Sequence, residues 1–326
     1  MRKITLDIWR LVAALLLVAL HASLLGQTKQ YAFHGAYVYT EFFFMISGFF
    51  MTEALEKKKF HEPLDYPIKT WKKIFPYTTI VIVLHYLFIG MLAGSTKELL
   101  KTIIKIPMEV LYLPELHILT AELGQLWYLS AMLIVMPLVC WIFIRDEKLF
   151  KSIMFLLPLL WLGYSFTTWG HLGHRGCFID LIRAFTILLL GGGAYYVVLE
   201  LNKKCLRGYW VTIIGHMSFL FTIILTYKYY LSQWDFYCIL FLFIALVASQ
   251  VNTFKDVKYL FLESCSELSL CIYIVHVPAG RYIQRFFSDS NIFTKYILYF
   301  GLTVLFASIL FLIMRFLKKR DVRFID

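Results

Sequence analysis

Long apolar segments recur along the whole chain and constrain its fold more than any other feature. A segment of about 20 apolar residues is long enough to cross a bilayer as one helix. Hydrophobic residues make up 60% of the 326 residues, charged residues make up 16%, and the mean hydropathy is +0.71. These values exclude a water-soluble core and predict an all-α integral membrane bundle of about ten transmembrane helices. The segments are expected at 6–25, 36–55, 74–93, 125–144, 152–170, 178–199, 209–226, 234–251, 267–282 and 295–317.

The Lys and Arg residues are distributed unevenly between the connecting segments. If the N-terminus is cytoplasmic, the cytoplasmic segments hold 21 of these residues and the external segments hold 9. Cytoplasmic loops of membrane proteins are enriched in Lys and Arg, so both termini are predicted to be cytoplasmic. The most basic inside loop is 56–73, and the long outside loop 94–124 contains a semi-amphipathic stretch.

The domain organisation, net charge and cysteines of the chain give three further expectations. No segment resembles a second domain, so residues 1–326 are expected to form a single transmembrane domain with no separate soluble domain. The net charge of +11 is attributed to loops beside membrane lipids rather than to nucleic-acid binding. The six cysteines form no Cys-x-x-Cys pair and no His spacing typical of zinc is present, so no metal site is expected.

Ionisable residues inside a bilayer are costly and therefore indicate function. Arg10 and His21 are eleven residues apart on the first segment, which places them on nearly the same helix face, about 16 Å apart along the axis. Asp7 lies one turn before Arg10 and is expected to pair with it. Glu41 on the second segment is expected at the depth of His21, where its carboxylate would fix the tautomer of the imidazole.

Several other intramembrane residues have more than one interpretation. His85 is interpreted either as lining a channel or as a structural hydrogen bonder, and Arg183 as a structural ion pair with Asp180. The small pair Ser47-Gly48 permits either close helix packing or the close approach of a ligand. The run 191–193 consists of three glycines and is the one candidate break within a spanning helix.

Several short motifs occur in a recognisable order. Ten residues separate Arg10 from His21, and the second segment reads Glu-Phe-Phe-Phe-Met-Ile-Ser-Gly-Phe from Glu41. The later motifs are Lys-Thr-Trp-Lys-Lys-Ile-Phe-Pro at 69–76, Leu-Trp-Tyr-Leu-Ser at 126–130 and Tyr-Ile-Val-His-Val-Pro at 273–278. Together they resemble the acyltransferase family 3 membrane proteins. Lysines stand where that family usually has arginines in the basic motif, and Ala131-Met132 stands where a Glu often follows the tryptophan motif.

The resemblance implies transfer of an acyl group, usually acetyl, from cytoplasmic acyl-CoA to a hydroxyl of an extracytoplasmic polysaccharide or lipid-linked sugar. His21 is expected to be the general base, oriented by Glu41, although an acyl-imidazole intermediate is an open alternative. Acyl-CoA is expected as a substrate and no permanently bound cofactor is expected. The family is largely bacterial, which implies the inner or plasma membrane. The expected donor-binding residues are Arg10, Lys69, Lys72 and Lys73, and the possible lining residues are Ser47, Trp127, His85 and His276.

Two other classes of protein also explain polar residues inside spanning helices. One is a secondary transporter or flippase for a glycan or lipid precursor, which would usually show paired broken helices in two matching halves. The other is a membrane scaffold or sensor without enzymatic activity. A requirement for acyl-CoA distinguishes the enzyme from both.

Overall fold

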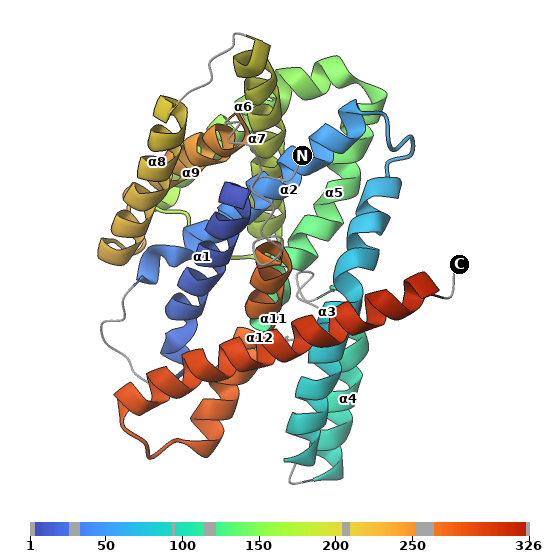
Figure 1. The fold of residues 1–326 in the computed structure, drawn as a ribbon, viewed down its shortest axis with the longest axis vertical. Coiled ribbons are helices and arrows are strands. Elements are labelled where there is room, and N and C mark those ends of the chain that lie inside the picture. Colours follow the sequence, from blue (N-terminus) through green and yellow to red (C-terminus); the bar gives the residue numbers. More distant parts are fainter. Residues whose placement is uncertain are drawn as a thin grey trace.

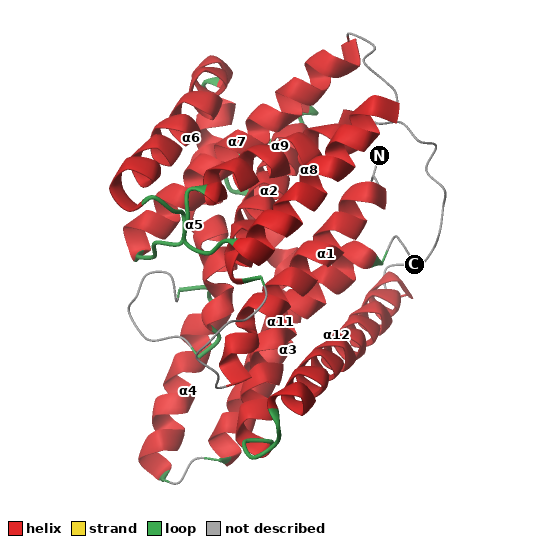
Figure 2. Ribbon diagram, turned by 90° about the vertical axis from the view of Figure 1, so that its left-hand side faces the viewer, coloured by secondary structure: helices red, strands yellow, loops and turns green. Residues whose placement is uncertain are grey.

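A computed structural model describes residues 4–25, 33–92, 95–113, 122–203, 209–251 and 264–323. These residues form eleven α-helices and short 3₁₀ turns, with no β-strand among them, so the prediction of an all-α membrane bundle is confirmed (Figures 1 and 2). The helices are α1 (Ile4–Leu20), α2 (Tyr39–Glu56), α3 (Asp65–Met91), α4 (Thr96–Val110), α5 (Trp127–Arg145), α6 (Glu147–Trp169), α7 (Cys177–Lys203), α8 (Tyr209–Lys228), α9 (Trp234–Val251), α11 (Cys265–Phe286) and α12 (Ile292–Arg323).

Every predicted spanning segment coincides with a helix. Eight of these helices are long and apolar enough to cross a membrane. The other two are α2 and α11, which carry more polar residues because they lie inside the bundle rather than against lipid. Glu41 in α2 and His276 in α11 are both buried. Both helices thus contribute polar residues to the interior of the bundle.

The boundaries of α3 differ from the prediction. The segment was expected to begin at 74 after a basic loop, but α3 begins at Asp65, and the basic motif 69–76 forms its second and third turns. Exposed lysines near a helix end reach solvent without breaking the helix, which explains why charge alone did not mark the boundary. The semi-amphipathic outside stretch forms α4, a helix that packs against α3.

Glycines allow α2 and α7 to pack closely together. A Cβ atom at Gly48 would overlap the backbone of Leu188, and one at Gly191 would overlap the backbone of Met45. Helix α7 continues through all three glycines, so the prediction of a helix break at 191–193 is wrong. These glycines instead permit close packing of two helices.

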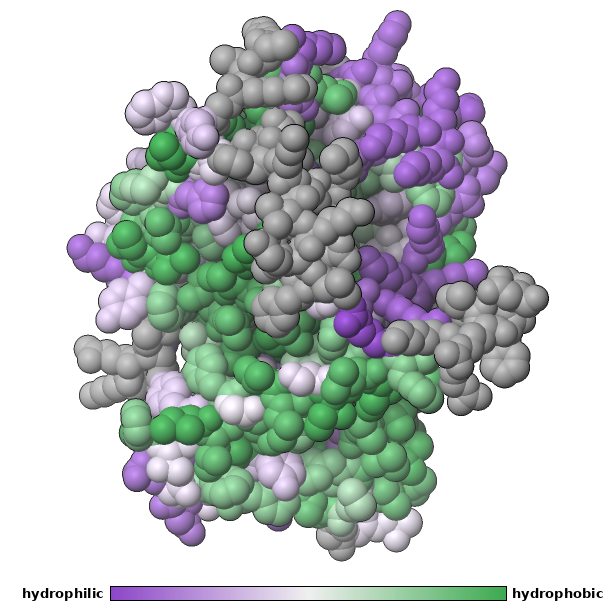
Figure 3. All heavy atoms as spheres, viewed as in Figure 1, coloured by the Kyte–Doolittle hydropathy of each residue, from purple (hydrophilic) through white to green (hydrophobic). Residues whose placement is uncertain are grey.

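The outer surface has the character expected of a protein solvated by lipid. Large apolar side chains such as Leu159 and Phe293 are 66% and 71% exposed. Hydrophobic residues dominate the middle and lower part of the face in Figure 3, and hydrophilic residues gather at its upper right, over the end of α2 and the start of α3. This hydrophilic end carries the basic motif and is the end that the charge distribution assigns to the cytoplasm.

Candidate active site

A cavity of about 460 Å³ lies inside the bundle. Its walls come from α1, α2, α3, α5 and α11. Asp7 and Arg10 line it from α1, and their side chains lie 3.8 Å apart, as their spacing predicts. Arg10 therefore faces an internal cavity and does not simply extend into the headgroups.

Two of the three expected donor-binding lysines reach this cavity. Lys69 and Lys73 line it from α3, four residues apart and thus on one face of the helix. Lys72 is exposed but does not line the cavity, because it lies 100° around the helix from Lys73. Glu267 contributes a carboxylate to the same end and accepts a hydrogen bond from Lys318 of 2.9 Å.

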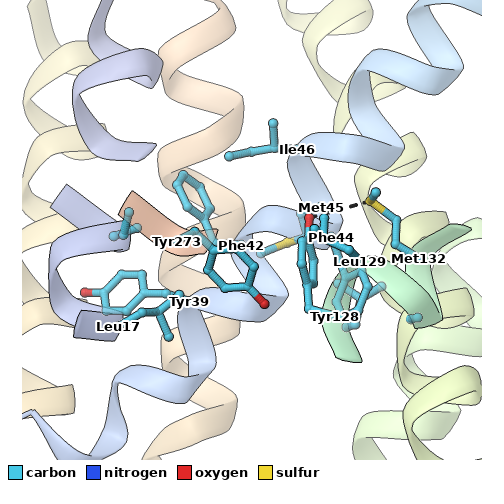
Figure 4. Packing of buried hydrophobic residues seen from close by; sticks show 14 of the residues in the cluster. Leu17, Tyr39, Phe42, Phe44, Met45, Ile46, Tyr128, Leu129, Met132 and Tyr273 are labelled. Atoms are coloured by element: carbon cyan, nitrogen blue, oxygen red, sulfur yellow. Dashed lines mark hydrogen bonds between the residues drawn. The ribbon is translucent and has the colours of Figure 1, made fainter. Parts of the chain in front are cut away.

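Aromatic rings form the inner end of the cavity. The ring centroids of Phe43 and Tyr128 are 6.1 Å apart, and those of Tyr128 and Tyr273 are 5.8 Å apart. Figure 4 shows Tyr128 and Tyr273 approaching the core from different helices, with a hydrogen bond from Tyr128 to Met132. Ser47 lines the cavity beside them, and its hydroxyl lies 3.4 Å from that of Tyr128.

Two histidines lie beyond these rings. His21 and His276 have ring centroids 4.8 Å apart, and the ring of Tyr273 lies 5.8 Å from that of His276. His21 is the first residue after α1 and begins a 3₁₀ turn. Nδ1 of His21 lies 2.9 Å from the carbonyl oxygen of Leu17. Since a carbonyl only accepts hydrogen bonds, Nδ1 must carry the proton in this arrangement, and Nε2 is left able to accept one.

His276 is completely buried. Neither of its ring nitrogens makes a hydrogen bond of good geometry with a described residue, and the nearest acceptors are the backbone carbonyls of Ile272 and Tyr273 in the preceding turn. A buried imidazole without a well-formed hydrogen bond is costly, so His276, beside His21, is a candidate to contact a ligand. The sequence identified both histidines as candidates, but it did not predict that their rings would be in contact.

The expected contact between Glu41 and His21 is not present. Glu41 instead accepts a hydrogen bond from Arg183, and both side chains are almost completely buried. Arg183 is thus an ion-pair residue as predicted, but its principal partner is Glu41, whereas its nearest contact with Asp180 is 3.9 Å. The prediction that Glu41 orients His21 is corrected: the backbone carbonyl of Leu17 performs that task, because a guanidinium competes more strongly for the carboxylate.

Trp127 links this ion pair to the loop between α6 and α7. The Arg183 guanidinium lies 5.3 Å from the centroid of the Trp127 ring, and the Arg175 guanidinium lies 3.8 Å from it. Such cation–π contacts hold a ring in place. The rings of Trp127 and Tyr128 have centroids 6.5 Å apart, so the Trp127 region adjoins the aromatic end of the cavity.

A second polar cluster lies at the opposite end of the bundle from the lysines. Glu122 accepts hydrogen bonds from Lys105 at 2.6 Å and from Arg281 at 2.5 Å. Burial raises the pKa of Glu122, but these two cations outweigh it and hold the pKa below the usual range. Glu109 accepts a hydrogen bond from Tyr86, and burial raises its pKa. His85 lies near this cluster and lines a separate pocket, so it is outside the cavity that holds Arg10.

The structure adds site residues that sequence reasoning missed. Tyr128 and Tyr273 lie within the quoted motifs and form the inner end of the cavity, and Glu267 lies at its polar end. Aromatic residues are abundant throughout this chain, so their identity alone carried no signal. In the described part of the chain, no cluster of three His, Cys, Asp or Glu residues has the arrangement of a metal site.

The fold and the cavity define a multi-pass membrane protein with a polar site inside its helix bundle. The family described as an acyltransferase domain matches residues 3–312, nearly the whole chain. The chain therefore belongs to acyltransferase family 3 and is a membrane acyltransferase. No curated protein and no solved structure matches the chain.

Proposed function

We propose that the protein transfers an acyl group, most simply acetyl, from cytoplasmic acyl-CoA to a hydroxyl of an extracytoplasmic glycan. The observation that carries this proposal is one cavity with cations at its cytoplasmic end and a histidine pair beyond its inner end. Its setting is a bacterial inner or plasma membrane, as the family resemblance implies.

The cytoplasmic end suits the nucleotide of acyl-CoA. Arg10, Lys69 and Lys73 supply three positive charges, which attract phosphates, and aromatic side chains nearby offer stacking surfaces. Lysine binds phosphate as a point charge without the bidentate geometry of arginine, so Arg10 is the one forked donor among the three. The thin pantetheine arm would then extend toward His21, about 16 Å along the helix axis from Arg10.

The histidine pair suits acyl transfer. Nε2 of His21 takes the proton of the acceptor hydroxyl while that oxygen attacks the thioester carbonyl. The carbon–sulfur bond breaks, and the departing CoA thiolate receives the proton from the His21 imidazolium, which leaves an ester and CoA thiol. His276 is placed to bind the acceptor hydroxyl or to share the charge of the imidazolium. An acyl group carried transiently on the imidazole is a second route through the same atoms.

Inverted membrane vesicles test the proposal directly. Acetyl-CoA labelled in the acetyl group is added to the exposed cytoplasmic face, and label is followed on glycan inside the vesicle. Label that accumulates only in vesicles containing the protein supports the proposal. Absence of label with acetyl-, succinyl- and longer acyl-CoA donors, with the glycan present, would overturn the assigned donor. Accumulation of unacylated glycan would instead identify a transporter.

A further inference from the structure

One backbone hydrogen bond of α11 is missing beside the histidine pair, at Pro278. Proline has no N–H group, so the carbonyl of Ile274, four residues earlier, lacks the partner that a regular α-helix would supply. His276 lies between these two residues, on the turn where the bond is missing. An unpaired carbonyl inside a membrane bundle is costly unless a neighbouring group compensates for the proline. The turn that carries His276 therefore depends on a group from another part of the chain.

The side chain of Gln125 supplies that group. Its Nε2 atom donates a hydrogen bond of 3.0 Å to the carbonyl oxygen of Ile274, which lies 149 residues away in the sequence. Because a carbonyl only accepts hydrogen bonds, the amide must present its NH2 group to α11. The Gln125 side chain is almost completely buried, so water does not compete for this bond.

A second hydrogen bond runs in the opposite direction between the same two segments. The hydroxyl of Tyr273 donates to the backbone carbonyl of Gln125, which lies in the 3₁₀ turn Gly124–Leu126 directly before α5. Tyr273 lines the cavity, and its ring lies 5.8 Å from that of His276. Two bonds at consecutive residues of α11 limit both its rotation and its sliding within one helical turn of His276.

The short turn that holds Gln125 is itself anchored on both sides. Before it, the backbone N–H of Leu123 donates a hydrogen bond of 3.1 Å to the buried carboxylate of Glu109. After it, Trp127 begins α5, and the Arg175 guanidinium lies 3.8 Å from the centroid of the Trp127 ring. A turn held in this way restrains α11 instead of following it.

We propose that Gln125 is a positioning residue for acyl transfer, whose amide fixes the proline turn of α11 so that His276 faces His21. The inference rests on the proposed function, in which both imidazoles meet the reacting groups. Gln125 acts through His276, because its NH2 group is bonded to the backbone of α11. Reacting groups must approach within about 3–3.5 Å, so a displacement of His276 by about 1 Å lowers the rate steeply. A purely structural hydrogen bond would stabilise the bundle without setting the position of the imidazole, and the two roles predict different results.

A pair of proline variants tests the hydrogen bond without any substrate. Gln125→Leu removes the donor and is expected to lower the thermal midpoint of the purified protein. Pro278→Ala restores the N–H that a regular helix directs at the Ile274 carbonyl, so Gln125→Leu should lower the midpoint less than half as much in Pro278→Ala protein. Pro158→Ala, which replaces a buried proline of α6, is the matched control and should leave the loss unchanged. An equal loss in all three backgrounds would overturn the assigned bond. If Gln125→Leu alone fails to fold, recovery of folded protein by Pro278→Ala but not by Pro158→Ala supports the bond, and recovery by neither overturns it.

Nitrogen NMR spectra of histidine-labelled protein test the positioning itself. The ring resonances of the pair are assigned with His21→Ala and His276→Ala, and His216, exposed on α8, serves as the internal reference. We expect Gln125→Leu to shift the ring resonances of both His21 and His276 and to leave those of His216 unchanged. Unchanged resonances of the pair would contradict the positioning role and leave Gln125 with a structural bond alone.

Transfer kinetics connect the position of His276 to catalysis. Gln125→Leu is expected to lower kcat about tenfold and to leave the KM for acyl-CoA unchanged, because the cationic end of the cavity is untouched. In His276→Ala protein, Gln125→Leu should have no further effect on kcat, since Gln125 acts through that imidazole. Equal fold losses with and without His276 would overturn the inference while the enzyme stands. Absence of transfer by the wild type would contradict the proposed function, and the ring resonances would then decide the positioning by themselves.

Discussion

His21 and His276 come from opposite ends of the chain, and their imidazole rings face one another with centroids 4.8 Å apart. The pair lies beyond the aromatic rings at the inner end of a cavity whose other end is cationic. A donor held by its phosphates at one end would therefore place its reactive end near the histidines. Donor binding is therefore assigned to the cationic end and acyl transfer to the histidine pair, and each step can be tested separately.

The cationic end predicts a selective loss of donor affinity. Replacing Lys69 and Lys73 together with Gln is expected to raise the KM for acyl-CoA about tenfold, corresponding to about 1.4 kcal/mol, with a smaller difference at high salt. Lys72→Gln is the matched control, because Lys72 is an exposed lysine of the same turn that does not line the cavity. Initial rates against acyl-CoA concentration distinguish them, and an equal KM change in the control would move the donor site elsewhere.

The buried pair of Glu41 and Arg183 predicts a structural effect. Removing one partner leaves an uncompensated buried charge, so Glu41→Gln is expected to cost about 3–5 kcal/mol of stability. The double replacement Glu41→Leu with Arg183→Met should recover most of the lost thermal midpoint. The pH profile of transfer is expected to stay unchanged in Glu41→Gln protein that remains folded. A shifted profile would return Glu41 to a direct role beside His21.

The glycine contact between α2 and α7 predicts a loss of stability when a side chain is added there. Gly48→Ala is expected to destabilise the protein by about 1–3 kcal/mol, because the added Cβ atom meets the backbone of Leu188. Gly163→Ala in α6 is the control, since nothing lies within 4 Å of a Cβ atom there. Thermal unfolding in detergent measures both, and equal midpoints would show that α2 and α7 tolerate separation.

The cluster around Glu122 predicts a pH-dependent contribution to stability. Lys105 and Arg281 hold the pKa of Glu122 below its usual range, so the ionised carboxylate stabilises the fold at pH above the ordinary carboxyl pKa of about 4.3. That contribution is lost as pH falls through the lower pKa of the folded protein. Glu122→Gln should therefore lower the thermal midpoint at neutral pH and differ less from wild type in acid. A difference that grows in acid would contradict the assigned ion pairs.

The sequence predicted the positions of the helices better than the contacts between them. Apolar segments are solvated by lipid whatever their neighbours, so each spanning helix was visible from its own residues. Pairing depends on how helices dock: Glu41 meets Arg183 because glycines bring α2 against α7. Helix periodicity predicted the pairing of Asp7 with Arg10, but His276 could not be matched to His21 without the packing of α1 on α11.

The rate of transfer by purified protein in liposomes, with acyl-CoA on the cavity side, tests the central claim most directly. His21→Ala is compared with His216→Ala, which removes an exposed histidine of α8 that makes a similar hydrogen bond, to the carbonyl of Thr212 at 2.8 Å. Loss of a general base costs about 10²–10⁴-fold in rate, so His21→Ala should fall by that factor while His216→Ala stays near wild type. Wild-type transfer by the His21→Ala protein would contradict the account.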